Sequence, residues 1–222
     1  DPFCGCGTTI DAAQKLGRKW IGIDITHLAI GLIKTRLSDA YGDEAKYDVI
    51  GEPTTVEDAA ELAKQEPYQF QAWALGLAGA RPAGAIKKGA DKGVDGRLYF
   101  HDGSDVDRQV VISVKAGKLH ANYVRDLAGV VASEKADIGV LISFDKPTQQ
   151  MRTWAAGQGF YSSPWGKHAR LQLLTVGELL AGKAIAREVW DRGFVCSSVE
   201  NAELRQSRLE EIDVEARFHV ID

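Results

Sequence analysis

A continuous apolar run from residue 138 to residue 144 constrains the fold of this chain more than any other feature. Its residues, Ile-Gly-Val-Leu-Ile-Ser-Phe, carry no charge and do not alternate between apolar and polar side chains. Such a run is typical of a strand that lies inside a sheet and is covered on both faces. Helical periodicity precedes it over 123–134 and follows it from Pro147, and a further strand is expected at 170–175. The sequence therefore predicts an α/β fold with a mixed β-sheet flanked by helices.

Two strands upstream of this run are expected to form a hairpin that turns at residues 102–107. Pairing positions whose numbers sum to about 210 puts Asp95 opposite or next to Lys115, with a register uncertain by a residue or two. Asp95 then shares one face with Ser113 and Lys115, because side chains alternate along a strand. A carboxylate can bind Mg²⁺, the ion can activate water, and a nearby lysine can offset charge that develops on a phosphate.

This layout of acid, hairpin and lysine resembles the PD-(D/E)XK nucleases, and the segments 89–96 and 112–115 resemble their Mrr-type restriction branch. The resemblance covers about 68–180 and implies a type II-like restriction endonuclease that cleaves double-stranded DNA with Mg²⁺. It implies Asp95 as metal ligand, Lys115 as catalytic lysine, and Gln71 on the first helix, where the branch often has Glu. Ser113 stands in the acidic position of the triplet and is a poor metal ligand. Gln71, Asp91 or the carbonyl of Val114 would then have to complete the metal shell.

Three interpretations of this site stay open at the level of sequence. The first is an active nuclease in which the catalytic group is Asp95, Lys115, Ser113 and Gln71. The second is a nuclease-like domain that binds DNA for a methyltransferase without cutting it, which the hydroxyl at position 113 favours. The third is an ordinary cross-strand ion pair on the surface, which would contribute only about 0–1 kcal/mol to stability.

The first 45 residues form a different unit. Gly5 and Gly7 permit tight turns, a helix is expected over about 8–16, a buried strand over 20–24 ends in Asp24, and a second helix begins near 26. An acid at the end of a strand, after a glycine-rich loop, suits the hydroxyls of a bound ribose. Ile10 takes the place of the third glycine of a dinucleotide fingerprint, and no lysine follows Gly7 as in a phosphate loop. Both of those cofactor sites are therefore disfavoured.

The opening Asp-Pro-Phe-Cys-Gly-Cys-Gly-Thr resembles the S-adenosylmethionine motif of amino-DNA methyltransferases, and residues 17–24 continue the resemblance. It implies a partial Rossmann-like βαβα methyltransferase fragment of a longer protein. The residues implied as contacts to S-adenosylmethionine in that intact parent are Asp1, Phe3, Gly5, Gly7 and Asp24. The catalytic motif of the Asp-Pro-Pro-Tyr type is missing, so we expect no methyl transfer and weak or no cofactor binding by this fragment.

The chain is expected to divide into a methyltransferase fragment at 1–50, an endonuclease-like domain at 56–184 and a charged tail at 185–222, with a linker at 51–58. The tail is expected to be a helical dimer arm or a solvated end. The net charge of −4 gives no global sign of nucleic-acid binding. Residues 81–118, however, hold eight Lys and Arg against five Asp and Glu. Contacts to DNA phosphates are therefore expected from Lys87, Lys88, Lys92 and Lys118.

The remaining sequence features concern location and assembly. No apolar run approaches the roughly 20 residues of a membrane helix. The three cysteines cannot all pair and no leader is recognisable, which predicts a reduced, cytoplasmic location. A Cys-x-Cys without further Cys or His nearby is a poor zinc site. Cutting both strands of a duplex commonly needs two active sites, which is compatible with a homodimer.

Overall fold

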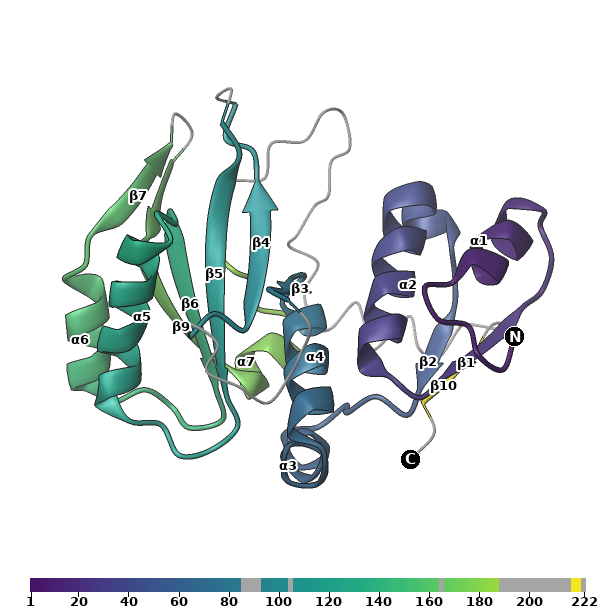
Figure 1. The fold of residues 1–222 in the computed structure, drawn as a ribbon, viewed down its shortest axis with the longest axis horizontal. Coiled ribbons are helices and arrows are strands. Elements are labelled where there is room, and N and C mark those ends of the chain that lie inside the picture. Colours follow the sequence, from purple (N-terminus) through teal and green to yellow (C-terminus); the bar gives the residue numbers. More distant parts are fainter. Residues whose placement is uncertain (85–92, 104–105, 164–165, 188–216, 221–222) are drawn as a thin grey trace.

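The computed structural model describes residues 1–84, 93–103, 106–163, 166–187 and 217–220. They form two units that lie side by side, a larger one built on a five-stranded sheet and a smaller one that contains the first 50 residues (Figure 1). Within the described ranges, none of the helices combines the length and the apolar character that a membrane span requires.

The larger sheet is mixed, as predicted. Its strand order is β3–β4–β5–β6–β9, in which β3, β4 and β5 are antiparallel and β5, β6 and β9 are parallel. The bounds are β3 (Arg81–Pro82), β4 (Gly96–Phe100), β5 (Arg108–Lys115), β6 (Ile138–Ser143) and β9 (Leu171–Thr175). All six residues of β6 are buried, which confirms that the apolar run is a strand covered on both faces.

Helices cover both faces of this sheet (Figure 1). On one face lie α3 (Val56–Gln65), α4 (Pro67–Leu77) and α7 (Val176–Leu180), and on the other lie α5 (Ala121–Ser133) and α6 (Gln149–Ala156). Helix α3 begins with a capping box in which Thr55 and Asp58 bond each other's backbone amides. The expected linker at 51–58 therefore ends three residues early, because its last residues already belong to α3. Pro67 occupies the first turn of α4, where its missing N–H costs nothing.

The hairpin of β4 and β5 sets the position of the predicted site. Gly96 pairs with Ile112, so Asp95, one residue earlier, lies across from Ser113, and Lys115 lies two residues further along β5. The register thus differs by two residues from the one expected, and a shift of two leaves every side chain on its predicted face. Val111 on that face is fully buried under α5, so both faces of β5 are core.

A short hairpin of β7 (Phe160–Ser163) and β8 (Gly166–Ala169) lies between α6 and β9 and was not predicted. Tyr161 anchors it, because its hydroxyl donates a hydrogen bond to the buried carboxylate of Asp102 beyond the end of β4. Arg108 Nε donates to the same carboxylate at 2.9 Å. These hydrogen bonds join the β7–β8 hairpin to the large sheet at the end of β4 and the start of β5.

The smaller unit holds a parallel sheet in the order β1–β10–β2. Its elements are α1 (Thr8–Lys15), β1 (Ile21–Asp24), α2 (His27–Tyr41), η1 (Gly42–Glu44), β2 (Asp48–Ile50) and β10 (Arg217–Val220). Two expectations need correction. The side chain of Ile21 is 53% exposed, so the strand expected to be buried is only partly so. The charged tail is not wholly a dimer arm or a solvated end, because β10 inserts between β1 and β2; residues 188–216 lie outside the described part.

The two units meet through α2 and α4, which lie side by side (Figure 1). Gln69 on α4 joins them with its side-chain amide. Its Nε2 donates to the carbonyl of Ile25 at 3.0 Å, and its Oε1 accepts from the backbone amide of His27 at 3.1 Å. One glutamine therefore bonds the turn that leads into α2 from two sides.

Candidate functional site

The carboxylate of Asp95 is the centre of the candidate site. Asp95 immediately precedes β4, and its backbone amide donates to the carbonyl of Ile112, which fixes the residue against β5. One carboxylate oxygen accepts from Gln71 Nε2 at 3.0 Å. The other accepts from Ser113 Oγ at 3.2 Å and from the backbone amide of Val114 at 2.7 Å. The fold thus brings Asp95, Gln71, Ser113 and Val114 together, although they come from a loop, a helix and a strand.

Lys115 shares the face of Asp95 but is held by a different neighbour. Its ammonium lies over the ring of Tyr123 on α5, 5.3 Å from the ring centroid. Among the residues that the structure describes, no ion pair joins Lys115 to Asp95. A cation over an aromatic face gains about 0.5–2 kcal/mol, depending on how far it is desolvated. The ring of Tyr123 therefore gives the lysine a partner other than the carboxylate.

The residues around Asp95 fit a magnesium ion poorly as they stand. Mg²⁺ takes an octahedral shell of oxygen ligands, usually one or two carboxylates with waters. Here both oxygens of Asp95 already accept hydrogen bonds from the protein, and both the hydroxyl of Ser113 and the amide nitrogen of Gln71 act as donors toward it. Within the described part of the chain, no three His, Cys, Asp or Glu side chains gather to hold a metal. Asp91, the other expected acid, lies outside that part.

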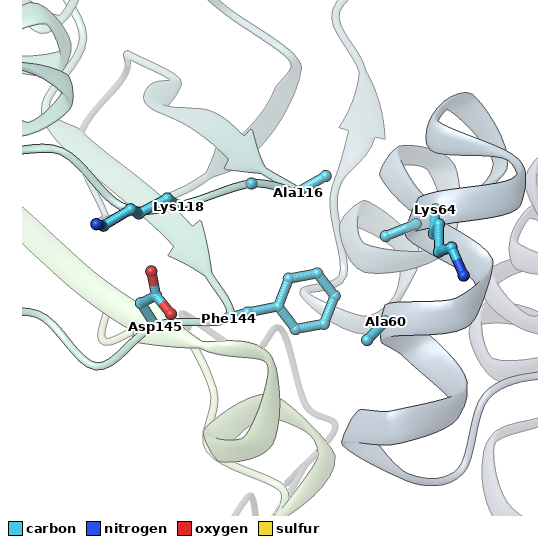
Figure 2. Close-up of a pocket in the computed structure, with 8 residues that line it drawn as sticks. Ala60, Lys64, Ala116, Lys118, Phe144 and Asp145 are labelled. Carbon is cyan, nitrogen blue, oxygen red and sulfur yellow. The ribbon is translucent and has the colours of Figure 1, made fainter.

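A pocket of about 490 Å³ opens just beyond the ends of β5 and β6 (Figure 2). The side chain of Phe144 points toward α3 and lies between the two walls of the pocket, with Ala60 opposite it. Its ring stacks on Phe70 with centroids 5.0 Å apart, which holds it in place. Asp145 and Lys118 lie on the side away from α3, and Lys64 stands on α3 itself. The pocket therefore has apolar walls and a rim of charged side chains.

The four lysines expected to bind DNA divide into two groups. Lys118 is exposed and lines the rim of this pocket, three residues after Lys115. Lys87, Lys88 and Lys92 lie outside the described residues. The sequence did not point to the pocket itself, because Phe144 and Ala60 are indistinguishable from ordinary core residues until the fold places them at the ends of the strands.

Among the residues expected to contact the cofactor, Gly5 is hydrogen-bonded directly to Asp24, and Asp1 bonds the backbone of Ile21 and Ile23 at β1. The Oδ2 atom of Asp24 accepts from the backbone amide of Gly5 at 2.9 Å, and its Oδ1 accepts from the backbone amide and hydroxyl of Thr26. Three of roughly four acceptor positions of the carboxylate are thus used by the chain, which leaves about one for a ligand hydroxyl. Gly7 has a φ of +78°, and a Cβ there would lie 2.5 Å from Ile33 Cγ1 on α2. Phe3 is 84% exposed.

Comparisons with known proteins match the two units separately. A family model described as NACHT-associated inactive Restriction Endonuclease 1 matches residues 79–181, and an N6/N4 DNA methylase model matches residues 1–35. The type II methyltransferase M.EcaI of Enterobacter cloacae is 50% identical over 38 residues. Those residues are 17% of this chain and 8% of that protein, so the chain spans less than a tenth of the curated relative. No solved structure matches.

Residues 79–181 are thus similar to a restriction-endonuclease family and residues 1–35 to DNA methylases, while the domain bounds expected from the sequence stay a prediction. The first match includes Asp95, Ser113 and Lys115 but begins after Gln71, so the helix that supplies the fourth residue lies outside it. Similarity to the Mrr-type branch in particular stays a prediction.

Proposed function

We propose that the larger unit is a nuclease-like module that binds DNA without cleaving it, in a protein related to restriction and modification. One observation carries this proposal. Among the described residues of the candidate site, the carboxylate of Asp95 accepts three hydrogen bonds, from Gln71, Ser113 and Val114, so it acts as a structural acceptor. Metal-dependent hydrolysis instead needs carboxylates that are open to an ion and its waters.

Three further observations support an absence of cleavage. The acidic position of the catalytic triplet holds Ser113, which is buried and donates its proton toward Asp95. The ammonium of Lys115 lies against Tyr123. The family whose model matches residues 79–181 is also described as inactive.

Binding to DNA is supported by charge at the ends of the strands. Lys64 and Lys118 are both exposed and stand on opposite walls of the pocket beyond β5 and β6 (Figure 2). Each lysine that contacts a phosphate releases about one counterion, so binding should weaken as salt rises. The methylase-like end of the chain also supports DNA as the common partner of both units.

A Mg²⁺-dependent, type II-like endonuclease is the second candidate. The observation in its favour is that Asp95 and Lys115 share one face of the sheet and that Asp95 is only half-buried. The three donors use about three of the four acceptor positions of Asp95, which leaves about one position for a metal ion. This candidate retains the roles expected from the sequence, with Asp95 as ligand and Lys115 as catalytic lysine.

The two candidates are separated by measuring binding and cleavage on the same DNA. A gel shift with duplex DNA at increasing salt is run beside incubation of supercoiled plasmid with Mg²⁺, Mn²⁺ or EDTA. We expect a shifted complex and intact plasmid. If the plasmid is cut in the presence of Mg²⁺ or Mn²⁺, and if both Asp95→Ala and Lys115→Ala abolish the cutting, the endonuclease is established instead. A missing complex at low salt would exclude both candidates.

The lysines on the pocket rim are tested in the same gel shift. Lys64→Ala and Lys118→Ala should each weaken binding and reduce the salt slope by about one. Lys167→Ala on β8 makes the same charge change at an exposed position outside the pocket and serves as the matched control. A control that weakens binding as much as the rim variants would show that the pocket has no special role.

We also propose that the methylase-like end binds S-adenosylmethionine weakly or not at all on its own, because only about one acceptor position of Asp24 is left for the ribose. Isothermal titration checks this, and a submicromolar dissociation constant would contradict it. A homodimer is tested by sedimentation of the protein with and without duplex DNA.

A further inference from the structure

The boundary between the two units carries a second polar pocket, separate from the candidate site. It has a volume of about 560 Å³ and lies against α2, with Arg81 of β3 contributing from the larger unit. From the smaller unit it is lined by Cys6, Thr35, Arg36 and Asp39, among others. None of the five residues expected to contact S-adenosylmethionine lines it, although Cys6 belongs to the same loop, between Gly5 and Gly7.

The two units are held together beside this pocket, which makes a composite site possible. The paired hydrogen bonds of Gln69 connect α4 to the turn before α2. Gly31 on α2 and the small residues Ala72 and Gly76 on α4 line a narrow space between the helices, where small side chains permit close approach. Arg36 and Arg81 are therefore presented from two units whose packing fixes them on the same pocket.

The charges in this pocket favour an anion. Across the described part of the chain, no ion pair joins Arg36 or Arg81 to a carboxylate, and Asp39 is the single acid among the lining residues. Two guanidinium groups against one carboxylate leave a positive excess. The pKa of the Cys6 thiol is lowered first by a hydrogen bond with Thr8 and then by the positive charge of Arg36, which shows that Arg36 lies near this thiol.

Guanidinium groups suit phosphate because their planar arrangement of N–H donors matches its oxygens in pairs. We propose that Arg36 and Arg81 together bind a phosphate group of the DNA backbone in this pocket, so that one strand contacts the methylase-like and the nuclease-like unit at once. This inference rests on DNA binding by the larger unit and adds a site that spans both units.

Cys6 provides a built-in reporter, because it is exposed and lines the pocket, whereas Cys4 is 5% exposed. The rate at which iodoacetamide alkylates Cys6 is measured by tandem mass spectrometry, alone and with duplex DNA, a nucleoside monophosphate or inorganic phosphate. Duplex DNA at saturation should slow alkylation about fivefold or more, since the bound form shields the thiol. The two small phosphates at equal phosphate concentration should not.

The test variant combines Arg36→Gln with Arg81→Gln. The control is Arg18→Gln, because Arg18 is an exposed arginine of the smaller unit that does not line the pocket. Removing Arg36 also changes the pKa of the Cys6 thiol and hence its alkylation rate. The rate for each protein is therefore compared with and without DNA. The double variant should lose the protection and about two units of salt slope, while Arg18→Gln keeps the protection.

The outcomes distinguish this site from the proposed function. A gel shift that shows bound DNA while Cys6 reacts at its free rate would overturn the phosphate site and leave DNA binding by the larger unit intact. Protection by inorganic phosphate or the monophosphate but not by duplex DNA would overturn the assignment to the DNA backbone. A missing gel shift together with an unprotected thiol would overturn both.

Discussion

Replacing Asp95 by Ala is the sharpest test of the site, because a structural acceptor and a metal ligand predict opposite signs. The change removes the partner of three donors, namely Gln71 Nε2, Ser113 Oγ and the amide of Val114. A hydrogen bond to a charged group contributes about 1.5–3 kcal/mol. Because Asp95 is half-buried, water can replace part of this, and we expect a loss of about 3 kcal/mol in the free energy of unfolding.

Urea denaturation followed by tryptophan fluorescence measures this loss. With a slope of about 1.5–2 kcal/mol per molar urea, the midpoint should fall by about 1.5–2 M. The control is Asp126→Ala, an exposed carboxylate on α5 with one long contact of 3.5 Å to Asn122, which should change stability by less than about 0.5 kcal/mol. If Asp95→Ala were as stable as this control, or more stable than the parent protein, the carboxylate would not be a structural acceptor.

Three other perturbations follow from the same structure. Ser113→Asp places a second carboxylate beside Asp95, so the variant should be less stable than the parent in EDTA and should regain stability with Mn²⁺ in a thermal melt. Burial and then a neighbouring carboxylate raise the pKa of Tyr161 above its ordinary value of 10, so stability should be lost as pH rises beyond about 10, and Tyr161→Phe should remove that slope in urea titrations. Gly139→Ala would put a Cβ 2.4 Å from Val131 Cγ2, and we expect a loss of about 1–3 kcal/mol by denaturation.

The parts of the fold that the sequence predicted are those governed by short-range patterns. The uncharged run at 138–144 is a fully buried strand, and the alternation along β4 and β5 places Asp95 and Lys115 on one face. Both patterns work because burial on a sheet face repeats every two residues. For the same reason the difference of two residues in the register, which lies within the expected uncertainty, left every face assignment intact.

The contacts that decide the chemistry depend on long-range packing and could not be predicted from the sequence. The sequence placed Gln71 on a helix, but not its amide within 3.0 Å of Asp95. It did not predict that the ammonium of Lys115 lies over the ring of Tyr123, because the two residues come from a strand and a later helix. The insertion of β10 between β1 and β2 joins residues almost 200 positions apart, which no local propensity can encode.

The Ser113 hydroxyl at the acidic position of the triplet affects both the stability of the site and its ability to bind a metal. A buried carboxylate at that position, across from Asp95, would put two like charges together and would need a cation to remain ionised. A buried serine has the opposite effect, since it donates to Asp95 and satisfies the charge from within the protein. The site then no longer needs an ion for its stability, and Lys115 can rest against Tyr123. In the proposed non-cleaving module, a hydroxyl in place of an acid keeps the hairpin and the sheet and removes the repulsion that a cation would otherwise offset.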